Sequence, residues 1–232
     1  MPQFLIPPGS KVGQTVSLSP ADSKHLIRVL RARPREKVRL FDGASRFEAE
    51  LVTLSPHGTT AKLTTLLVTP AQRGNVTLCQ ALLKKEKIEW VIQKSVELGA
   101  TRFVPFVSER TIPTGKKETQ SSRWQKIADE ALKQCGRVTP LKIDSVLPLQ
   151  ELLQKGPGTR ILFHESGSRL PSLSPDRPTS LFIGPEGGFA PQEIEAAKSN
   201  GLAIASLGTL TMRAETAAIA ALTLIQHGLG NI

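Results

Sequence analysis

Cysteine and long apolar segments are both scarce in this 232-residue chain. The two cysteines, Cys79 and Cys135, show no metal-ligand spacing; we expect reduced, buried thiols, although the sequence does not exclude a disulfide between them. No apolar run approaches the roughly 20 residues that a membrane-spanning helix needs. The opening MPQFLIPPGS lacks a basic segment and is interrupted by prolines, which is not typical of a signal peptide. These absences predict a cytoplasmic protein without a membrane anchor.

The familiar motifs for nucleotides, metals and hydrolysis are missing as well. The sequence has no G-x-G-x-x-G after the first strand of its second half and no G-x-x-x-x-G-K-[ST], which argues against a Rossmann site and a P-loop. It also lacks H-E-x-x-H, paired-cysteine and G-x-S-x-G motifs, so neither a metal centre nor a hydrolase elbow is indicated. We therefore expect no metal ion.

Acidic residues are too few to balance the basic ones. There are 30 Lys and Arg against 20 Asp and Glu, which gives a formal net charge of +10 and favours a polyanionic partner. Residues 28–39 carry one acidic side chain, Glu36, and six basic ones: Arg28, Arg31, Arg33, Arg35, Lys37 and Arg39. Because clustered like charges repel each other, we favour a contact with nucleic-acid phosphates over a merely solvated face.

Residues 1–72 have the pattern of a small β-rich domain. Ser19 and Pro20 predict the N-cap and first position of a helix, with Asp22 in its first turn. The segments 37–42, 46–54 and 59–68 are strand-like, with turns at Gly43 and at 56–58. We expect a small barrel, because a short open sheet would leave its edges unprotected.

Residues 73–232 instead alternate between strands and helices. We expect strands at 75–83, 101–107, 141–146, 160–164, 180–184 and 202–208, and helices at 85–99, 122–135, 191–201 and near the end. Ser122 and Gln125 form a capping box in this prediction, and Cys135 belongs to a core stripe. The polar segment 108–122, between the expected strand at 101–107 and the expected helix at 122–135, is predicted to be a surface loop. This alternation predicts a mainly parallel sheet covered on both faces.

Unusual residues stand at three expected strand ends, where ligands gather in parallel α/β sheets. They are the segments FHES (163–166), GPEGG (184–188) and LGTLTMRAETA (207–217). GPEGG alone could be a tight turn, but Glu186 within it and the third segment about twenty residues later favour a ligand lying on the backbone. The helix that follows Arg213 and Glu215 is apolar nearly all round, which predicts a second buried surface and hence a dimer.

Several stretches spread over nearly the whole chain share a family pattern: HLIRVLR, LFDG, KKEKIEWVIQKSVELGATRFVPFVSERT, RWQKIADEALKQCGR, FHES, IGPEGGFAPQEI and SLGTLTMRAETAA. In these the chain resembles the knotted (SPOUT) methyltransferases, and among them the family that methylates N3 of a uridine in small-subunit (16S) ribosomal RNA. The resemblance implies a PUA-like RNA-binding barrel at 1–72 and an α/β domain with a trefoil knot at 73–232. It also implies a homodimer through the knot domain and S-adenosyl-L-methionine as methyl donor.

The resemblance further implies which residues hold this cofactor. They come from three segments: His164, Glu165, Ile183, Gly184, Pro185, Glu186, Gly187, Gly188, Leu207, Gly208, Met212, Arg213 and Thr216. The chain departs from the family pattern at Leu210, where an arginine is usual, and at Ala190, where a serine is common. Loss of a serine N-cap should cost the following helix about 1 kcal/mol.

The mechanism implied for this family starts from a protonated uridine N3, a poor nucleophile. Arg213 is the candidate for stabilising negative charge on the base. Glu186 and Glu215 are candidates for the base or for balancing the sulfonium and, equally, for helix-end partners. Bound RNA would contact Arg28, Arg31, Arg33, Arg35, Lys37, Arg110, Lys116, Lys117, Arg123 and Arg137. Two alternatives stay open: a non-catalytic RNA-binding or ribosome-assembly protein, and a knotted methyltransferase acting on tRNA or another rRNA site.

Overall fold

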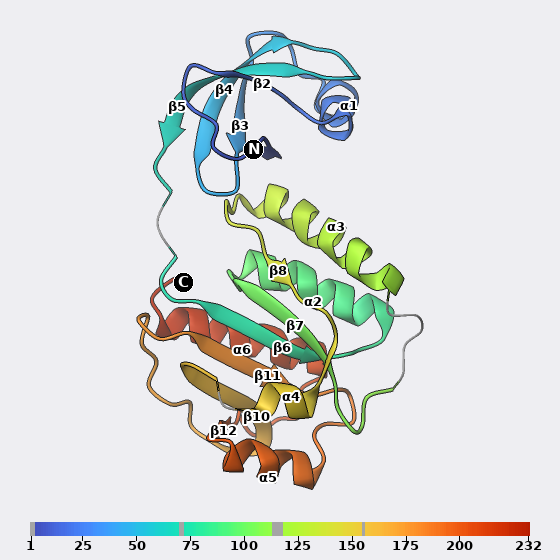
Figure 1. Cartoon of the computed structure of the whole chain (residues 1–232), viewed down its shortest axis with the longest axis vertical. Helices are drawn as coiled ribbons and strands as arrows, with labels where there is room; N and C mark the ends of the chain where they lie inside the picture. Colours follow the sequence, from blue (N-terminus) through green and yellow to red (C-terminus); the bar gives the residue numbers. More distant parts are fainter. Residues whose placement is uncertain (1–2, 70–71, 113–117, 155) are drawn as a thin grey trace. The chain divides into compact units, whose positions relative to one another are not determined.

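The computed structural model describes residues 3–69, 72–112, 118–154 and 156–232 and divides into two compact units (Figure 1). The first unit contains Met1–Ala71 together with Leu132–Pro140, and the second contains Gln72–Ala131 and Leu141–Ile232. The segment Leu132–Pro140 therefore packs with the first unit, although the chain has already entered the second. Gln3 Nε2 donates to the carbonyl oxygen of Arg137 at 2.5 Å, and this hydrogen bond holds the segment Leu132–Pro140 against β1 (Gln3–Leu5).

The first unit is a curled five-stranded sheet, a half-barrel. Its strands lie in the order β1 (Gln3–Leu5), β3 (Lys37–Phe41), β4 (Arg46–Thr53), β5 (Thr60–Leu67) and β2 (Thr15–Ser17). Alternation along these strands buries one face, whose core includes Leu40, Leu51 and Leu63. Helix α1 (Pro20–Arg28) begins as predicted, because Ser19 Oγ accepts the Asp22 N–H at 3.1 Å.

The second unit is built on a parallel sheet. The strand order is β12 (Ala203–Ala205), β10 (Thr159–Ser168), β11 (Thr179–Ile183), β6 (Val76–Ala81), β7 (Arg102–Val107) and β8 (Lys142–Ile143), and β9 (Leu147–Pro148) also pairs with β7. Each of these pairings is parallel. The central strands β6 and β11 are buried nearly throughout, as expected for a sheet covered on both faces.

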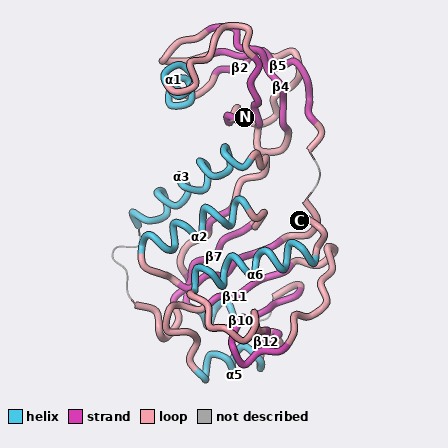
Figure 2. Tube along the Cα trace, turned by 180° about the vertical axis from the view of Figure 1, so that it is seen from behind, coloured by secondary structure: helices cyan, strands magenta, loops and turns pink. Residues whose placement is uncertain are grey.

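Helices cover both faces of this sheet. Figure 2 shows α2 (Lys85–Glu97) and α6 (Ala214–Gly228) lying across one face, and α6 contacts both β6 and β11. On the other face, α4 (Leu149–Leu153) and α5 (Pro191–Ser199) contribute to a core that contains Phe106, Phe182 and Phe189. The predicted fold class, a small β-barrel followed by an α/β domain with a mainly parallel sheet, is confirmed, and the barrel is a half-barrel.

Local details differ from the sequence predictions in three places. Helix α3 (Glu118–Cys135) begins a turn before Ser122, so Ser122 lies inside the helix rather than at its N-cap, and residues 118–122 are helical rather than loop. Cys135 is exposed because it is the last residue of α3, beyond the packed part of the apolar stripe. Strand β10 continues to Ser168, so His164 and Glu165 lie within it rather than after it. Lys116 and Lys117 lie outside the described residues.

Candidate functional site

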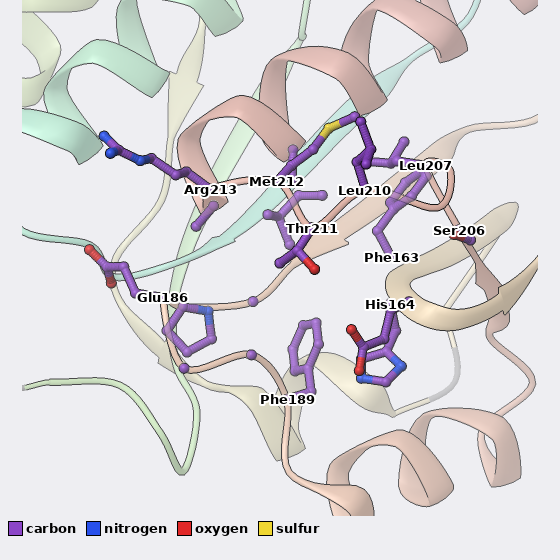
Figure 3. A pocket seen from close by; sticks show the side chains of 18 of the residues that line it. Phe163, His164, Glu186, Phe189, Ser206, Leu207, Leu210, Thr211, Met212 and Arg213 are labelled. Atoms are coloured by element: carbon purple, nitrogen blue, oxygen red, sulfur yellow. The ribbon is translucent and has the colours of Figure 1, made fainter.

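A cavity of about 570 Å³ opens where the parallel strands β10, β11 and β12 end (Figure 3). The three unusual segments of the sequence converge on it, as the rule for parallel sheets predicts. Its lining residues are Lys87, Arg110, Phe163, His164, Glu165, Ile183, Gly184, Pro185, Glu186, Gly187, Gly188, Phe189, Ser206, Leu207, Gly208, Thr209, Leu210, Thr211, Met212, Arg213, Ala214 and Ala217. A cavity of this size holds a ligand the size of a nucleoside.

Backbone geometry gives the two main loops of the cavity their shape. After the buried strand β11 the chain turns back on itself, and Gly188 N–H donates to the carbonyl oxygen of Pro185 at 2.9 Å. Gly188 has φ +68° and Gly208, in the segment that precedes α6, has φ +129°. L-residues with a side chain rarely adopt such angles, so glycine is needed at both turns.

A buried carboxylate holds the GPEGG loop in place. Glu193, in the first turn of α5, is 4% exposed. Its Oε2 accepts the N–H of Ala190 at 2.8 Å and its Oε1 accepts the N–H of Glu109 at 2.9 Å. Ala190 has no side-chain acceptor, so only this half of a capping box exists at the start of α5. Glu193 thus ties the GPEGG loop to the segment that follows β7.

One end of the cavity carries a compact group of charges. Lys87 Nζ, in the first turn of α2, lies 3.3 Å from a carboxylate oxygen of Glu186 and 3.3 Å from Oε2 of Glu215. Desolvation lowers the pKa of Lys87, but the contacts with Glu186 and Glu215 more than offset it, so the pKa lies above its usual value. Lys87 is therefore a permanent cation that joins α2, the GPEGG loop and the first turn of α6.

Arg213 lies at this same end. It is the N-cap residue of α6, with an extended backbone, and its side chain reaches out beside Glu186 in Figure 3. Among the described residues, no carboxylate comes within ion-pair distance of its guanidinium, whereas Lys87 pairs with both Glu186 and Glu215. Arg213 thus presents an uncompensated positive charge to the cavity.

The opposite end is more apolar and contains His164. Figure 3 shows Phe163 and Leu207 at this end, with Leu210 beside them, and Leu210 is 81% exposed. His164 Nδ1 accepts the N–H of Ser166 at 3.2 Å, so a neutral His164 ring carries its proton on Nε2. A flat, partly apolar group fits this end, and a charged or reacting group fits the other.

The structure brings most of the predicted cofactor residues together. All of them except Thr216 line the cavity; Thr216 is exposed in the first turn of α6. Glu215 is not a lining residue, but it reaches the site through Lys87. Sequence reasoning missed Lys87, because nothing in KKEK distinguishes one lysine from its neighbours. It also missed Phe163 and Phe189, which lie next to predicted residues and which apolar character alone could have suggested.

The basic residues predicted for RNA fall into different environments. Arg28, Arg31, Arg33 and Arg35 are exposed, and no described carboxylate forms an ion pair with them. In contrast, Lys37 pairs with Glu48 at 2.8 Å and Arg123 pairs with Glu89 at 2.5 Å. Burial lowers the pKa of Arg137, which packs in the first unit, and Arg110 lines the cavity. The exposed arginines at 28–35 remain the strongest candidates for phosphate contacts.

No described helix has the length and apolar character to cross a membrane. Within the part of the chain that the structure describes, no three His, Cys, Asp or Glu side chains are grouped so that they could hold a metal ion.

Comparison with known proteins gives a consistent result. The model of the RNA methyltransferase domain family matches residues 70–226. A ribosomal RNA small subunit methyltransferase E from Synechocystis is 32% identical, with 96% of this chain and 76% of that protein covered. The crystal structure of a ribosomal RNA small subunit methyltransferase E from Neisseria gonorrhoeae, bound to S-adenosylmethionine, is 34% identical with a TM-score of 0.91, covering 98% and 97% of the two chains. A Legionella pneumophila protein in complex with the same cofactor is 30% identical with a TM-score of 0.88, covering 97% and 96%.

Proposed function

The chain belongs to the RNA methyltransferase family whose model it matches over residues 70–226, and from this membership we propose that it methylates small-subunit (16S) ribosomal RNA at N3 of a uridine, with S-adenosylmethionine as donor. The observation that carries the proposal is the convergence of the three predicted segments on one cavity. The relative from Neisseria gonorrhoeae, which shares the fold over nearly its full length, was solved with this cofactor.

The residues that line the cavity fit S-adenosylmethionine. Its volume, about 570 Å³, suits a ligand of this size. The cofactor combines a flat adenine, a cationic sulfonium and a zwitterionic amino acid. Phe163, Leu207 and Leu210 provide apolar surface for the adenine, while Glu186 at the other end offers a negative charge to the cationic groups of the cofactor. Bound there, the cofactor supplies an electrophilic methyl group.

The chain's own residues must make uridine N3 reactive. N3 carries a proton at neutral pH, and its lone pair becomes a good nucleophile only when that proton leaves. Arg213, uncompensated at the charged end, stabilises the negative charge that then develops on the uracil ring. Glu186 or Glu215 accepts the proton, directly or through water, as the new N3–methyl bond forms. The GPEGG loop, fixed by Glu193, keeps the reacting groups in place.

The target base must be accessible on its Watson–Crick edge, where N3 lies. We expect an unpaired or flipped uridine, held by phosphate contacts from the exposed arginines at 28–35. Such contacts position the RNA, whereas the cavity selects the base. Because ribosomal RNA is the substrate, we expect the enzyme to work in the cytoplasm.

A homodimer through the knot domain is also part of this proposal. Helix α6 buries Ala218, Leu222 and Ile225 against its own unit, yet Leu224 on the same helix is 43% exposed. On α2, which contacts α6, Trp90 is 42% exposed. A second copy would remove these apolar side chains from water. The trefoil knot itself stays a prediction.

The test is incubation of the purified protein and S-adenosylmethionine with 16S rRNA or small subunits from cells lacking the gene, followed by mass spectrometry of nucleosides. N3-methyluridine at one site is the expected product. Calorimetry that shows no binding of S-adenosylmethionine would favour the non-catalytic RNA-binding alternative. A methylated nucleoside found only in tRNA, or at another rRNA site, would favour the second alternative.

A further inference from the structure

At the charged end of the cavity, a single cation, Lys87, makes the ion pairs that the structure describes there. Two cations, Lys87 and Arg213, stand beside two carboxylates, Glu186 and Glu215. Lys87 lies 3.3 Å from both carboxylates, and among the described residues Arg213 pairs with neither. Glu215 is only two residues from Arg213 in the chain, and Glu186 extends toward the same end of the cavity in Figure 3. Within the part of the chain that the structure describes, Arg213 thus has no ion-pair partner, although two carboxylates lie at the same end of the cavity.

We propose that Lys87 is a positioning residue that holds Glu186 and Glu215 and so keeps the guanidinium of Arg213 available for the target base. This inference rests on the proposed function, because it concerns the charge that develops on the uracil during methyl transfer. Lys87 acts through Arg213 and does not itself contact the reacting atoms.

The charge of the group supports this role. With Lys87 present, two cations and two carboxylates sum to zero, so the site accepts a developing anion without net repulsion. Without Lys87 the sum becomes −1, which disfavours negative charge on the base. In addition, the released carboxylates would be able to attract Arg213, which lines the same end of the cavity. Because the side chains of Glu186 and Glu215 are only 28% and 14% exposed, water screens this attraction incompletely.

The position of Lys87 also supports it. Lys87 is anchored in α2, while Glu186 belongs to the GPEGG loop and Glu215 to α6. Its raised pKa, which results from its contacts with both carboxylates against the opposing effect of desolvation, keeps it charged at any physiological pH. A cation from a separate helix can hold both carboxylates without moving with the GPEGG loop or with α6.

The test compares methyl transfer by Lys87→Met with that of the wild type, using rRNA and S-adenosylmethionine. We expect kcat to fall at least about tenfold, because a stabilising charge is lost to ion pairing. Affinity for S-adenosylmethionine, measured by calorimetry, should change by less than about threefold. Lys94→Met is the matched control, since Lys94 lies on the same helix, pairs with Glu97 and does not line the cavity. It should behave like the wild type.

Second-site variants test whether Lys87 acts through its positive charge or only by holding Glu186 and Glu215 in place. At most one of Glu186 and Glu215 accepts the proton, so Glu→Gln at the other should restore part of the kcat of Lys87→Met. If neither double variant exceeds Lys87→Met, the inference is overturned. Lys87→Gln, which removes the positive charge but keeps a polar side chain, should lose kcat to a similar extent and serves if Lys87→Met does not fold. Wild-type kcat in Lys87→Gln would also overturn the inference.

A crystal structure of Lys87→Met or Lys87→Gln gives a direct readout that is independent of activity. Arg213 should then form an ion pair with Glu186 or Glu215; an unchanged Arg213 would contradict the inference. The outcome is separable from the proposed function. If the wild type transfers no methyl group to rRNA, the proposed function fails, whereas a wild type that is active alongside an equally active Lys87→Met rejects only the role of Lys87.

Discussion

The guanidinium of Arg110 donates a hydrogen bond of 3.1 Å to the carbonyl oxygen of Gly187. A Cβ at Gly187 would lie 3.2 Å from the Cβ of Arg110, so the two segments touch closely. The segment after β7 therefore forms the outer wall of the GPEGG loop. Arg110, which the sequence suggested as an RNA contact, contributes to the cavity, and its contact with RNA stays a prediction.

The contact between the GPEGG loop and the segment after β7 also depends on Glu193. Glu193→Ala should lower the free energy of unfolding by about 2–3 kcal/mol, because one buried and one part-buried N–H group lose their charged acceptor. It should also weaken S-adenosylmethionine binding, since the GPEGG loop loses its anchor. Urea denaturation and calorimetry measure the two effects. Glu195→Ala, on the same helix but in an exposed pair with Lys198, should change stability by less than about 0.5 kcal/mol. Equal effects of the two variants would refute the assigned role.

Arg213 should be essential for turnover but not for folding. Arg213→Ala is expected to lower kcat by about 10²–10³-fold, the usual effect of removing one group that stabilises a developing anion. The proposed dimer should remain intact in size-exclusion chromatography, because Arg213 is exposed at the start of α6. Arg177→Ala changes an exposed arginine outside the cavity and should retain full activity. Near-normal turnover of Arg213→Ala would remove Arg213 from the mechanism.

The exposed arginines of the first unit should dominate the salt dependence of RNA binding. Replacing Arg31, Arg33 and Arg35 with Ala should reduce the slope of log K against log salt by about two, at about 0.7 per phosphate contact for single strands. Lys37→Ala should have a smaller effect, because Lys37 is already paired with Glu48. Fluorescence anisotropy at several salt concentrations measures both slopes. A slope unaltered by the triple replacement would mean that these arginines are only solvated.

The two thiols should differ in reactivity and in their effect on stability. Burial raises the pKa of Cys79 to about 12, whereas Cys135 is exposed, so one thiol should react with a thiol reagent at pH 8 in the folded protein and two in denaturant.

The raised pKa of Cys79 contributes stability below its ordinary value of 9.0, and this contribution is lost as the pH rises from about 9 toward 12. Urea midpoints of the wild type should therefore fall more steeply above pH 9 than those of Cys79→Ala. Parallel curves would contradict this.

Local sequence signals were sufficient for most of the elements. The N-cap at Ser19, the stop of α2 before Gly99 and the strands β3 to β7 follow from capping, glycine and alternation, which act over a few residues. The sequence did not predict elements correctly where the local signals were weak or where a second capping signal was possible. The short strands β1, β2 and β9 carry too few residues for a pattern, and α3 begins before its apparent capping box.

By itself, the sequence determined the fold class and the three segments of the site, because a buried parallel strand and a glycine-rich turn each leave a local pattern. Only the tertiary structure decided how charges are paired. Lys87 lies about a hundred residues before Glu186 along the chain, and no local pattern encodes their contact. The same holds for Glu193 with Glu109 and for Leu132–Pro140 with the first unit. Such contacts depend on how the strands are ordered in the sheet, which is a property of the whole chain.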